Sequence, residues 1–188
     1  MKVYNFSDNS SLYNKFLSEL RDENIQKDSM RFRKNLERLG EISAYEISKT
    51  FKENVLVTKT PLGTSKTSVP SENLVLATVL RAGLPLHNGL LKYYDNAENC
   101  FISAYRKHTS KEEFEVEIQY MASPNLTDKI VLLSDPMLAT GRSMVLAYKA
   151  LLKKGILAES CLKNEKIEKL NLYPSRPQRP LKKAQHSI

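Results

Sequence analysis

The stretch from Lys129 to Gly155, KIVLLSDPMLATGRSMVLAYKALLKKG, decides the fold class. It begins with an unbroken apolar run, Ile130 to Leu133, which is typical of a strand buried on both faces of a parallel sheet. From Ser143 onward apolar residues recur at spacings of three and four, which predicts an amphipathic helix that ends at Gly155. A strand, a short turn and a helix in this order indicate an α/β protein with a largely parallel sheet flanked by helices.

The turn inside this stretch is rich in small and hydroxyl residues, including Thr140, Gly141 and Ser143. The N–H groups and the positive dipole end of the following helix point at this turn, which predicts a cradle for phosphate. Asp135 ends the strand, where open α/β sheets bind ligands, and a carboxylate there suits sugar hydroxyls. Phosphate plus ribose is therefore the predicted ligand. Similar strand–turn–helix units also occur without a phosphate site, and this turn carries neither GxxxxGK[ST] nor GxGxxG.

The segment DPMLATGRS closely resembles the phosphoribosyl-diphosphate (PRPP) loop of uracil phosphoribosyltransferases, whose usual form is DPMLATGGS. Three other segments resemble the same family in the right order. They are RFRKNLERLGEISAYEI near the N-terminus, the apolar strand NLVLATVL (73–80) that delivers Arg81-Ala82-Gly83, and the strand CFISAY (100–105) that delivers Arg106 and Lys107. The chain is identified as a member of this family from about residue 30 to about residue 155.

The resemblance implies a type I phosphoribosyltransferase fold with an antiparallel hairpin lid. It also implies transfer of the phosphoribosyl group of PRPP to N1 of uracil, which gives UMP and diphosphate. In this family Mg²⁺ is held largely by the substrate's own oxygens, so no metal ligand from the protein is expected. A homodimer or a higher homo-oligomer is expected as well.

The resemblance also assigns the site residues. Arg81 and Arg106 would bind diphosphate, because a guanidinium gives paired N–H bonds to phosphate oxygens. Asp135 would hold the ribose hydroxyls, and Asp135 and Arg106 are the predicted catalytic residues. The full PRPP-binding set is Arg81, Arg106, Asp135, Pro136, Met137, Leu138, Ala139, Thr140, Gly141, Arg142 and Ser143, with the 5′-phosphate at Ala139 to Ser143. Solvated surface charges are the alternative interpretation of both arginines.

Arg142 stands where the family has its second glycine. If that position needs a left-handed backbone, a non-glycine residue costs roughly 1 to 2 kcal/mol and distorts the cradle. If the backbone there is ordinary, Arg142 adds a phosphate donor.

Residues 113–121, EFEVEIQYM, alternate apolar and polar side chains, which is typical of a half-exposed antiparallel strand. Paired with a neighbouring strand, this segment would form a hairpin that excludes water from the site. An ordinary solvent-facing edge strand explains the pattern equally well.

Composition indicates one domain of a cytoplasmic protein, since the chain of 188 residues begins with a polar segment and has no apolar run of transmembrane length. Cys100 in a predicted buried strand and Cys161 in a polar segment argue against a disulfide framework. His87, His108 and His186 show no metal-ligand spacing, and surface or turn positions are expected for them.

The C-terminal segment differs from the rest of the chain. Residues 153–188 carry +6 of the total net charge of +8. The predicted phosphoribosyltransferase domain is residues 1–155, and residues 156–188 are predicted to be a divergent basic tail that is partly disordered. Apolar residues in it support a short helix from Glu159 to about Leu172.

The family continues after the last predicted helix with two strands and a segment resembling YIxPGLGDAGD that recognises uracil. No such segment is present here, so no uracil-binding residue is identifiable. We expect a truncated or frameshifted end after about residue 155, missing C-terminal strands and an uncovered sheet edge.

Three functions are consistent with the sequence. The first is a uracil phosphoribosyltransferase, and the second is a catalytically defective relative that binds PRPP. The third is a nucleic-acid-binding regulator that uses the basic tail, although this tail has a single aromatic residue, Tyr173, and no RNA-binding signature.

Overall fold

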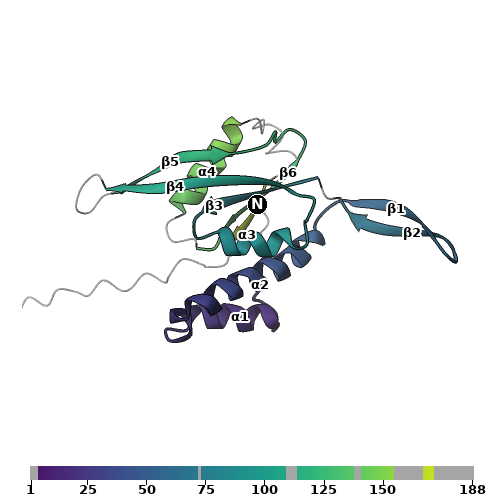
Figure 1. Cartoon of the computed structure of the whole chain (residues 1–188), viewed down its shortest axis with the longest axis horizontal. Coiled ribbons are helices and arrows are strands. Elements are labelled where there is room, and N and C mark those ends of the chain that lie inside the picture. Colours follow the sequence, from purple (N-terminus) through teal and green to yellow (C-terminus); the bar gives the residue numbers. More distant parts are fainter. Residues whose placement is uncertain (1–3, 72, 109–113, 138–140, 155–166, 172–188) are drawn as a thin grey trace, which may run out of the picture.

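The computed structural model describes residues 4–71, 73–108, 114–137, 141–154 and 167–171, arranged as helices on two faces of a sheet with a separate hairpin (Figure 1). The helices are α1 (Leu12–Arg21), α2 (Ser29–Ser48), α3 (Leu84–Leu91) and α4 (Arg142–Lys153), with a 3-10 turn η1 (Ile25–Lys27). The strands are β1 (Glu53–Thr60), β2 (Gly63–Pro70), β3 (Leu74–Leu80), β4 (Glu98–His108), β5 (Phe114–Ala122), β6 (Ile130–Asp135) and β7 (Ile167–Asn171). Within these ranges no helix has the length and apolarity needed to cross a bilayer.

The main sheet has five strands in the order β5-β4-β3-β6-β7. Strand β3 pairs in parallel with β4 and β6, whereas β5 pairs antiparallel with β4. The predicted α/β class, the parallel strands and the antiparallel β4–β5 hairpin are thus confirmed. Whether this hairpin acts as a lid stays a prediction.

Strand β7 corrects the predicted C-terminal segment. Residues 167–171 form a strand that pairs in parallel with β6, with Val131 opposite Ile167, rather than the end of a helix. The two apolar residues at 167 and 170 fit a helical spacing, but the backbone groups along the edge of β6 offer a strand partner. The expectation that β6 lies at an uncovered edge is therefore wrong over this range. The predicted disorder of residues 172–188 lies outside the described residues.

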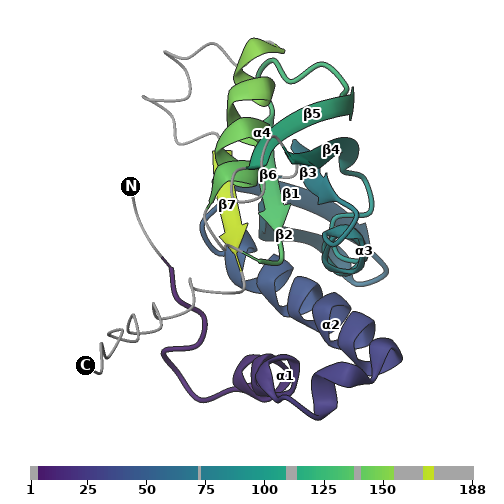
Figure 2. The same ribbon diagram turned by 90° about the vertical axis from the view of Figure 1, so that its left-hand side faces the viewer.

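The two faces of the sheet are covered by different helices, because successive strand residues point to opposite faces. Leu74 and Leu76 of β3 pack in a core with α1, α2 and α3. Val75, Ala77 and Val79 pack in a second core with buried residues of α4. Figure 2 shows the layers from the side, with α4 apart from the α1–α2 pair. Cover on both faces explains why the central strands β3 and β6 lack polar alternation in sequence.

Helices α2 and α3 cross at two glycines. A Cβ atom on Gly89 would overlap the carbonyl oxygen of Glu37, and one on Gly40 would overlap that of Leu86. Beyond α3, the Tyr94 hydroxyl donates to the carbonyl oxygen of Ala44 at 2.6 Å. The helices therefore approach backbone to backbone, which fixes α3 against α2.

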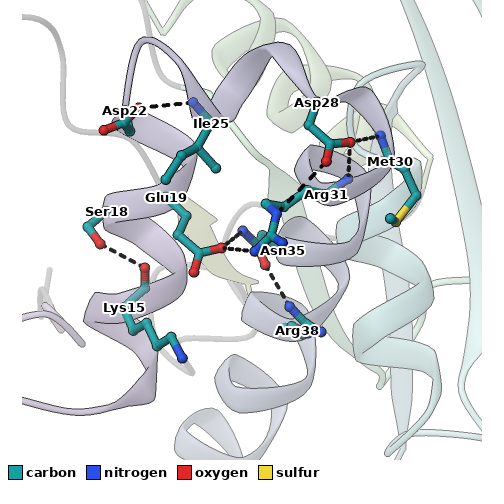
Figure 3. A network of polar contacts seen from close by, with 10 residues as sticks. All are labelled: Lys15, Ser18, Glu19, Asp22, Ile25, Asp28, Met30, Arg31, Asn35 and Arg38. Atoms are coloured by element: carbon teal, nitrogen blue, oxygen red, sulfur yellow. Dashed lines mark hydrogen bonds and ion pairs between the residues drawn. The ribbon is translucent and has the colours of Figure 1, made fainter.

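A polar network joins α1 to α2 on the outer side of this layer (Figure 3). Asp28 caps α2 by accepting hydrogen bonds from the backbone N–H groups of Met30 at 3.1 Å and Arg31 at 3.0 Å. The Asn35 amide, fully buried, donates to Glu19 of α1 at 2.7 Å and lowers the pKa of that carboxyl. This network fixes where α2 begins and how α1 lies on it.

The β1–β2 hairpin extends away from the sheet and helices (Figure 1). Its apolar side chains at Val55, Leu56 and Val57 are exposed, and so is Leu62 at the hairpin turn. No sequence prediction covered this element.

Candidate active site

Three of the predicted PRPP residues lie on neighbouring strands at the carboxyl edge of the parallel sheet. Arg81 follows β3, Asp135 ends β6, and the backbone of Arg106 lies in β4, on the opposite side of β3 from β6. Thr78 pairs with Ser134, so the next residues along the two strands, Val79 and Asp135, are level with each other. Arg81 therefore lies two residues, or about 7 Å along the strand direction, beyond Asp135. Arg106 lies beyond Ser103, the residue that pairs with Leu80 at the end of β3. Three neighbouring strands thus present the three predicted residues at one edge.

Arg81 lies in a tight turn between β3 and α3. The peptide bond before it is cis, the side chain is exposed, and the backbone N–H of Leu84 donates to the Arg81 carbonyl oxygen at 3.2 Å. Gly83 folds back onto the strand end, where a Cβ atom would lie 2.6 Å from both Thr78 Cγ2 and the Val79 carbonyl oxygen. The glycine of the RAG segment is therefore required by a close approach of the backbone.

Asp135 is half-buried at the end of β6. Burial raises the pKa of its carboxyl, and a hydrogen bond from the Met137 N–H to Oδ1 at 3.2 Å acts in the opposite direction. The neighbouring Pro136 is buried, whereas Met137 is exposed. A carboxylate held this way offers acceptor oxygens at the sheet edge, as hydroxyl recognition requires.

The predicted cradle lies where β6 leads into α4. Gly141 caps α4 with a left-handed backbone (φ 73°), and Arg142 is the first residue of the helix, with an exposed side chain. The residue with the left-handed backbone is thus Gly141, the glycine that this chain shares with the family's loop. Arg142 follows it in the helix and carries no left-handed strain. Ser143 is half-buried in the first turn, where backbone N–H groups lack helical acceptors. Leu138, Ala139 and Thr140 lie outside the described residues.

His87 corrects a sequence interpretation. It was expected at a surface or turn position, but its side chain is 2 % exposed, and its Nδ1 lies 2.9 Å from Thr78 Oγ1. Burial lowers the pKa of this imidazole, and a hydrogen bond with Asn99 acts in the opposite direction. The signal in the sequence was the pair of hydroxyl residues, Thr78 and Ser134, inside otherwise apolar strands.

A parallel sheet with a strand-end carboxylate, an arginine turn and a helix N-terminus at one edge is typical of the α/β proteins that bind phosphorylated ligands. Comparison with known proteins narrows this class. The family model "Uracil phosphoribosyltransferase" matches residues 7–163. The chain belongs to the uracil phosphoribosyltransferase family, as the sequence resemblance indicated. The match continues past residue 155, where the resemblance was predicted to end.

Individual relatives agree with this assignment. The chain is 55 % identical over 155 residues to a uracil phosphoribosyltransferase of Porphyromonas gingivalis, covering 82 % of this chain and 72 % of the relative. A relative of the same name from Thermococcus gammatolerans is 38 % identical over 156 residues, covering 81 % and 67 %.

Solved structures share the fold. The AQ2163 protein from Aquifex aeolicus superposes with a TM-score of 0.69 at 27 % identity, covering 87 % of this chain and 83 % of that one. A hypoxanthine-guanine phosphoribosyltransferase from Bacillus anthracis superposes with a TM-score of 0.50 at 16 % identity, covering 72 % and 66 %. The predicted type I phosphoribosyltransferase fold is thereby confirmed.

Proposed function

We propose that this chain transfers the phosphoribosyl group of PRPP to N1 of uracil, a salvage reaction of the cytoplasm that yields UMP and diphosphate. The proposal is supported by family membership together with one observation. Arg81, Asp135 and the N-terminus of α4 lie at one edge of the sheet, carried by β3, β6 and the turn after β6.

Each group has a task in such a transfer. The reaction passes through an oxocarbenium-like state with a highly charged leaving group, so the protein must neutralise diphosphate and hold the ribose in line. Arg81 and Arg106 donate to the diphosphate, and Asp135 accepts hydrogen bonds from the ribose hydroxyls. The turn from Ala139 to Ser143 binds the 5′-phosphate, with Arg142 as an added donor.

Magnesium fits this arrangement as a companion of the substrate. Among the described residues, no three His, Cys, Asp or Glu side chains are grouped to hold a metal ion. Asp135 is a hard oxygen ligand at this edge, but Mg²⁺ usually binds through substrate phosphates and keeps several waters. We therefore propose that it arrives on the oxygens of PRPP, where it would offset the charge of the leaving group.

Formation of UMP by the purified chain from uracil, PRPP and Mg²⁺, with a control lacking uracil, tests the proposal. Turnover is expected. PRPP binding without UMP formation by a folded sample would favour the defective relative instead. The nucleic-acid hypothesis predicts RNA binding with a steep salt dependence that is lost when residues 173–188 are deleted, and affinity that ignores this deletion contradicts it.

Asp135→Asn is the sharpest single substitution for the site. It keeps the size of the side chain but removes one of the two acceptor oxygens and the charge. We expect PRPP binding, measured by calorimetry, to weaken about tenfold or more, because hydrogen bonds to a charged group are stronger than neutral ones. Asp128→Asn, on the loop before β6 at the opposite edge of the sheet, serves as the matched control. Unchanged affinity in Asp135→Asn would remove this carboxylate from the site.

We also propose that the chain forms a homodimer through the β1–β2 hairpin. A lone two-stranded hairpin is marginally stable in water, and this one exposes Val55 and Val57, two residues apart on one face, together with Leu56 and Leu62. We call Val55 and Val57 the apolar strip. A second copy of the chain presents the same strip, so the two copies can pair through a symmetric interface. Light scattering is expected to give twice the chain mass for the wild type and a monomer for the Val55→Asp/Val57→Asp double variant. A wild-type monomer contradicts the dimer.

A further inference from the structure

A row of paired side chains, two of them buried hydroxyl residues, lies on the face of the sheet that α3 covers. Phe101, Thr78 and Ser134 occupy paired positions of β4, β3 and β6. Thr78 and Ser134 are fully buried, and their hydroxyl oxygens lie 2.8 Å apart. His87 of α3 covers the row, with Nδ1 2.9 Å from Thr78 Oγ1 and its ring centroid 5.0 Å from that of Phe101.

The Thr78 hydroxyl links His87 Nδ1 to Ser134 Oγ, accepting from one of them and donating to the other. The Ser134 hydroxyl also lies 3.4 Å from the Ala77 carbonyl oxygen, to which it can donate. The Asn99 side chain hydrogen-bonds the imidazole in the direction that raises its pKa, so Asn99 accepts from the ring. Burial lowers the pKa of His87, which agrees with a neutral ring in this network.

The row lies directly beneath the candidate active site. Asp135 is the residue after Ser134, and Arg81 lies three residues after Thr78. Gly83 ends the turn between β3 and α3 and lies close to Thr78 Cγ2, and the His87 N–H donates to the Gly83 carbonyl oxygen at 2.9 Å. A shift of His87 therefore reaches both strand ends through one hydrogen-bonded chain.

We propose that His87 is a positioning residue of the active site, which fixes the end of β6 with Asp135 relative to the end of β3 with Arg81 by hydrogen bonding through Thr78 to Ser134. An apolar side chain would fill the same space between α3 and the sheet at lower desolvation cost. The histidine instead gives a directional link across three elements. This role rests on the proposed function, since it concerns the geometry of the PRPP site.

Three substitutions of His87 separate positioning from packing. Asparagine places an amide, which can donate or accept, near the position of Nδ1. Glutamine places an amide near the position of Nε2, and leucine keeps only apolar bulk. We expect His87→Leu and His87→Gln to raise the Kd for PRPP about tenfold, the worth of one buried hydrogen bond, and His87→Asn to stay within about twofold of the wild type. Thr78→Val, which removes the central hydroxyl isosterically, is expected to match His87→Leu and covers the case in which His87→Leu does not fold.

Tyr94→Phe is the matched control, because it removes another buried hydrogen bond, from Tyr94 to Ala44, at the other end of α3. It should lower the melting temperature without changing the Kd for PRPP. If His87 has a purely structural role, the Kd for PRPP should change only in proportion to the loss of stability in each variant. His87→Asn should then bind PRPP no better than His87→Gln. Equal PRPP affinity in the wild type, folded His87→Leu and Thr78→Val would overturn the proposal.

An NMR measurement separates this proposal from the proposed function. In the unliganded chain, the backbone amide signals of Asp135 and Arg81 are expected to move in His87→Leu and to return toward wild-type positions in His87→Asn. Unmoved signals overturn the positioning role. A wild-type chain that binds no PRPP while these signals move would contradict the proposed function and leave the positioning of the two strand ends supported.

Discussion

The β1–β2 hairpin and strand β3 contain similar aliphatic side chains in opposite surroundings. Val55, Leu56 and Val57 of β1 are exposed, whereas the aliphatic residues of β3 from Leu74 to Val79 are buried between α3 and α4. Strand β3 has a strand on each side and a helix over each face, while β1 pairs with β2 alone. The burial of a strand residue is therefore set by the strands and helices that cover it. Apolar composition alone does not predict this burial.

The same contrast separates two kinds of sequence constraint. Positions in the sheet and its helices are limited by space and by hydrogen-bond partners, because close-packed interiors respond to even one methyl group. Positions in the hairpin are limited by backbone conformation and, in our proposal, by a second copy of the chain. Substitutions in matched pairs test this division.

The largest effect is expected at the glycines. Gly89→Ala puts a Cβ onto the Glu37 carbonyl oxygen at the α2–α3 crossing, and separating two packed helices costs about 3 kcal/mol or more of unfolding free energy. Gly63→Ala meets no atom within 4 Å, but its φ of 136° is unfavourable for alanine, at about 1 to 2 kcal/mol. Urea denaturation measures both values. Equal losses of unfolding free energy in Gly89→Ala and Gly63→Ala would show that steric crowding does not distinguish the helix crossing from the hairpin.

A smaller difference in unfolding free energy is expected between a buried and an exposed threonine when each is replaced by valine. Thr78→Val leaves His87 and Ser134 without their shared partner in the core, at a cost of about 1 to 3 kcal/mol. Thr58→Val in β1 changes an exposed side chain and is expected to stay within about 0.5 kcal/mol. Thermal unfolding of the two variants provides the check, and a Thr58 effect as large as that of Thr78 would contradict the comparison.

The ionised carboxylate of Asp135 should destabilise the folded chain, although the proposed binding site needs it. Its pKa is raised by burial in the folded chain, so the native state binds more protons than the unfolded state between the unfolded and folded pKa values. Stability from this group is therefore present at low pH and lost as the pH rises through that window. Asp135→Asn is expected to raise the melting temperature at pH 7 more than at pH 4. An increase in melting temperature that is the same at both pH values would contradict an origin in the raised pKa of Asp135.

The sequence predicted the parts of the site that short segments encode. The apolar run to Asp135 and the helix predicted from Ser143, which begins at Arg142 in the structure, follow from local pattern, and the RAG segment was found by resemblance. The burial of His87 was not predicted, because the hydroxyl partners that satisfy it, Thr78 and through it Ser134, lie on strands apart from its own helix. Strand β7 was missed for a related reason, since its hydrogen bonds are supplied by β6 and not by its own residues.

The smallest effect on the single chain, and the sharpest test of the comparison, is expected from Val55→Thr/Val57→Thr in the hairpin. Threonine keeps β-branching and strand propensity but adds hydroxyls on an already exposed face, so monomer stability should change by less than about 0.5 kcal/mol. The melting temperature of the wild type should rise with protein concentration if the exposed strip is a dimer interface, and that dependence should weaken in the variant. Thr58→Ser, in the same strand but on the face opposite Val55 and Val57, should keep the wild-type concentration dependence. A wild-type melting temperature that is independent of concentration would mean that the hairpin's apolar residues have no partner in a second chain.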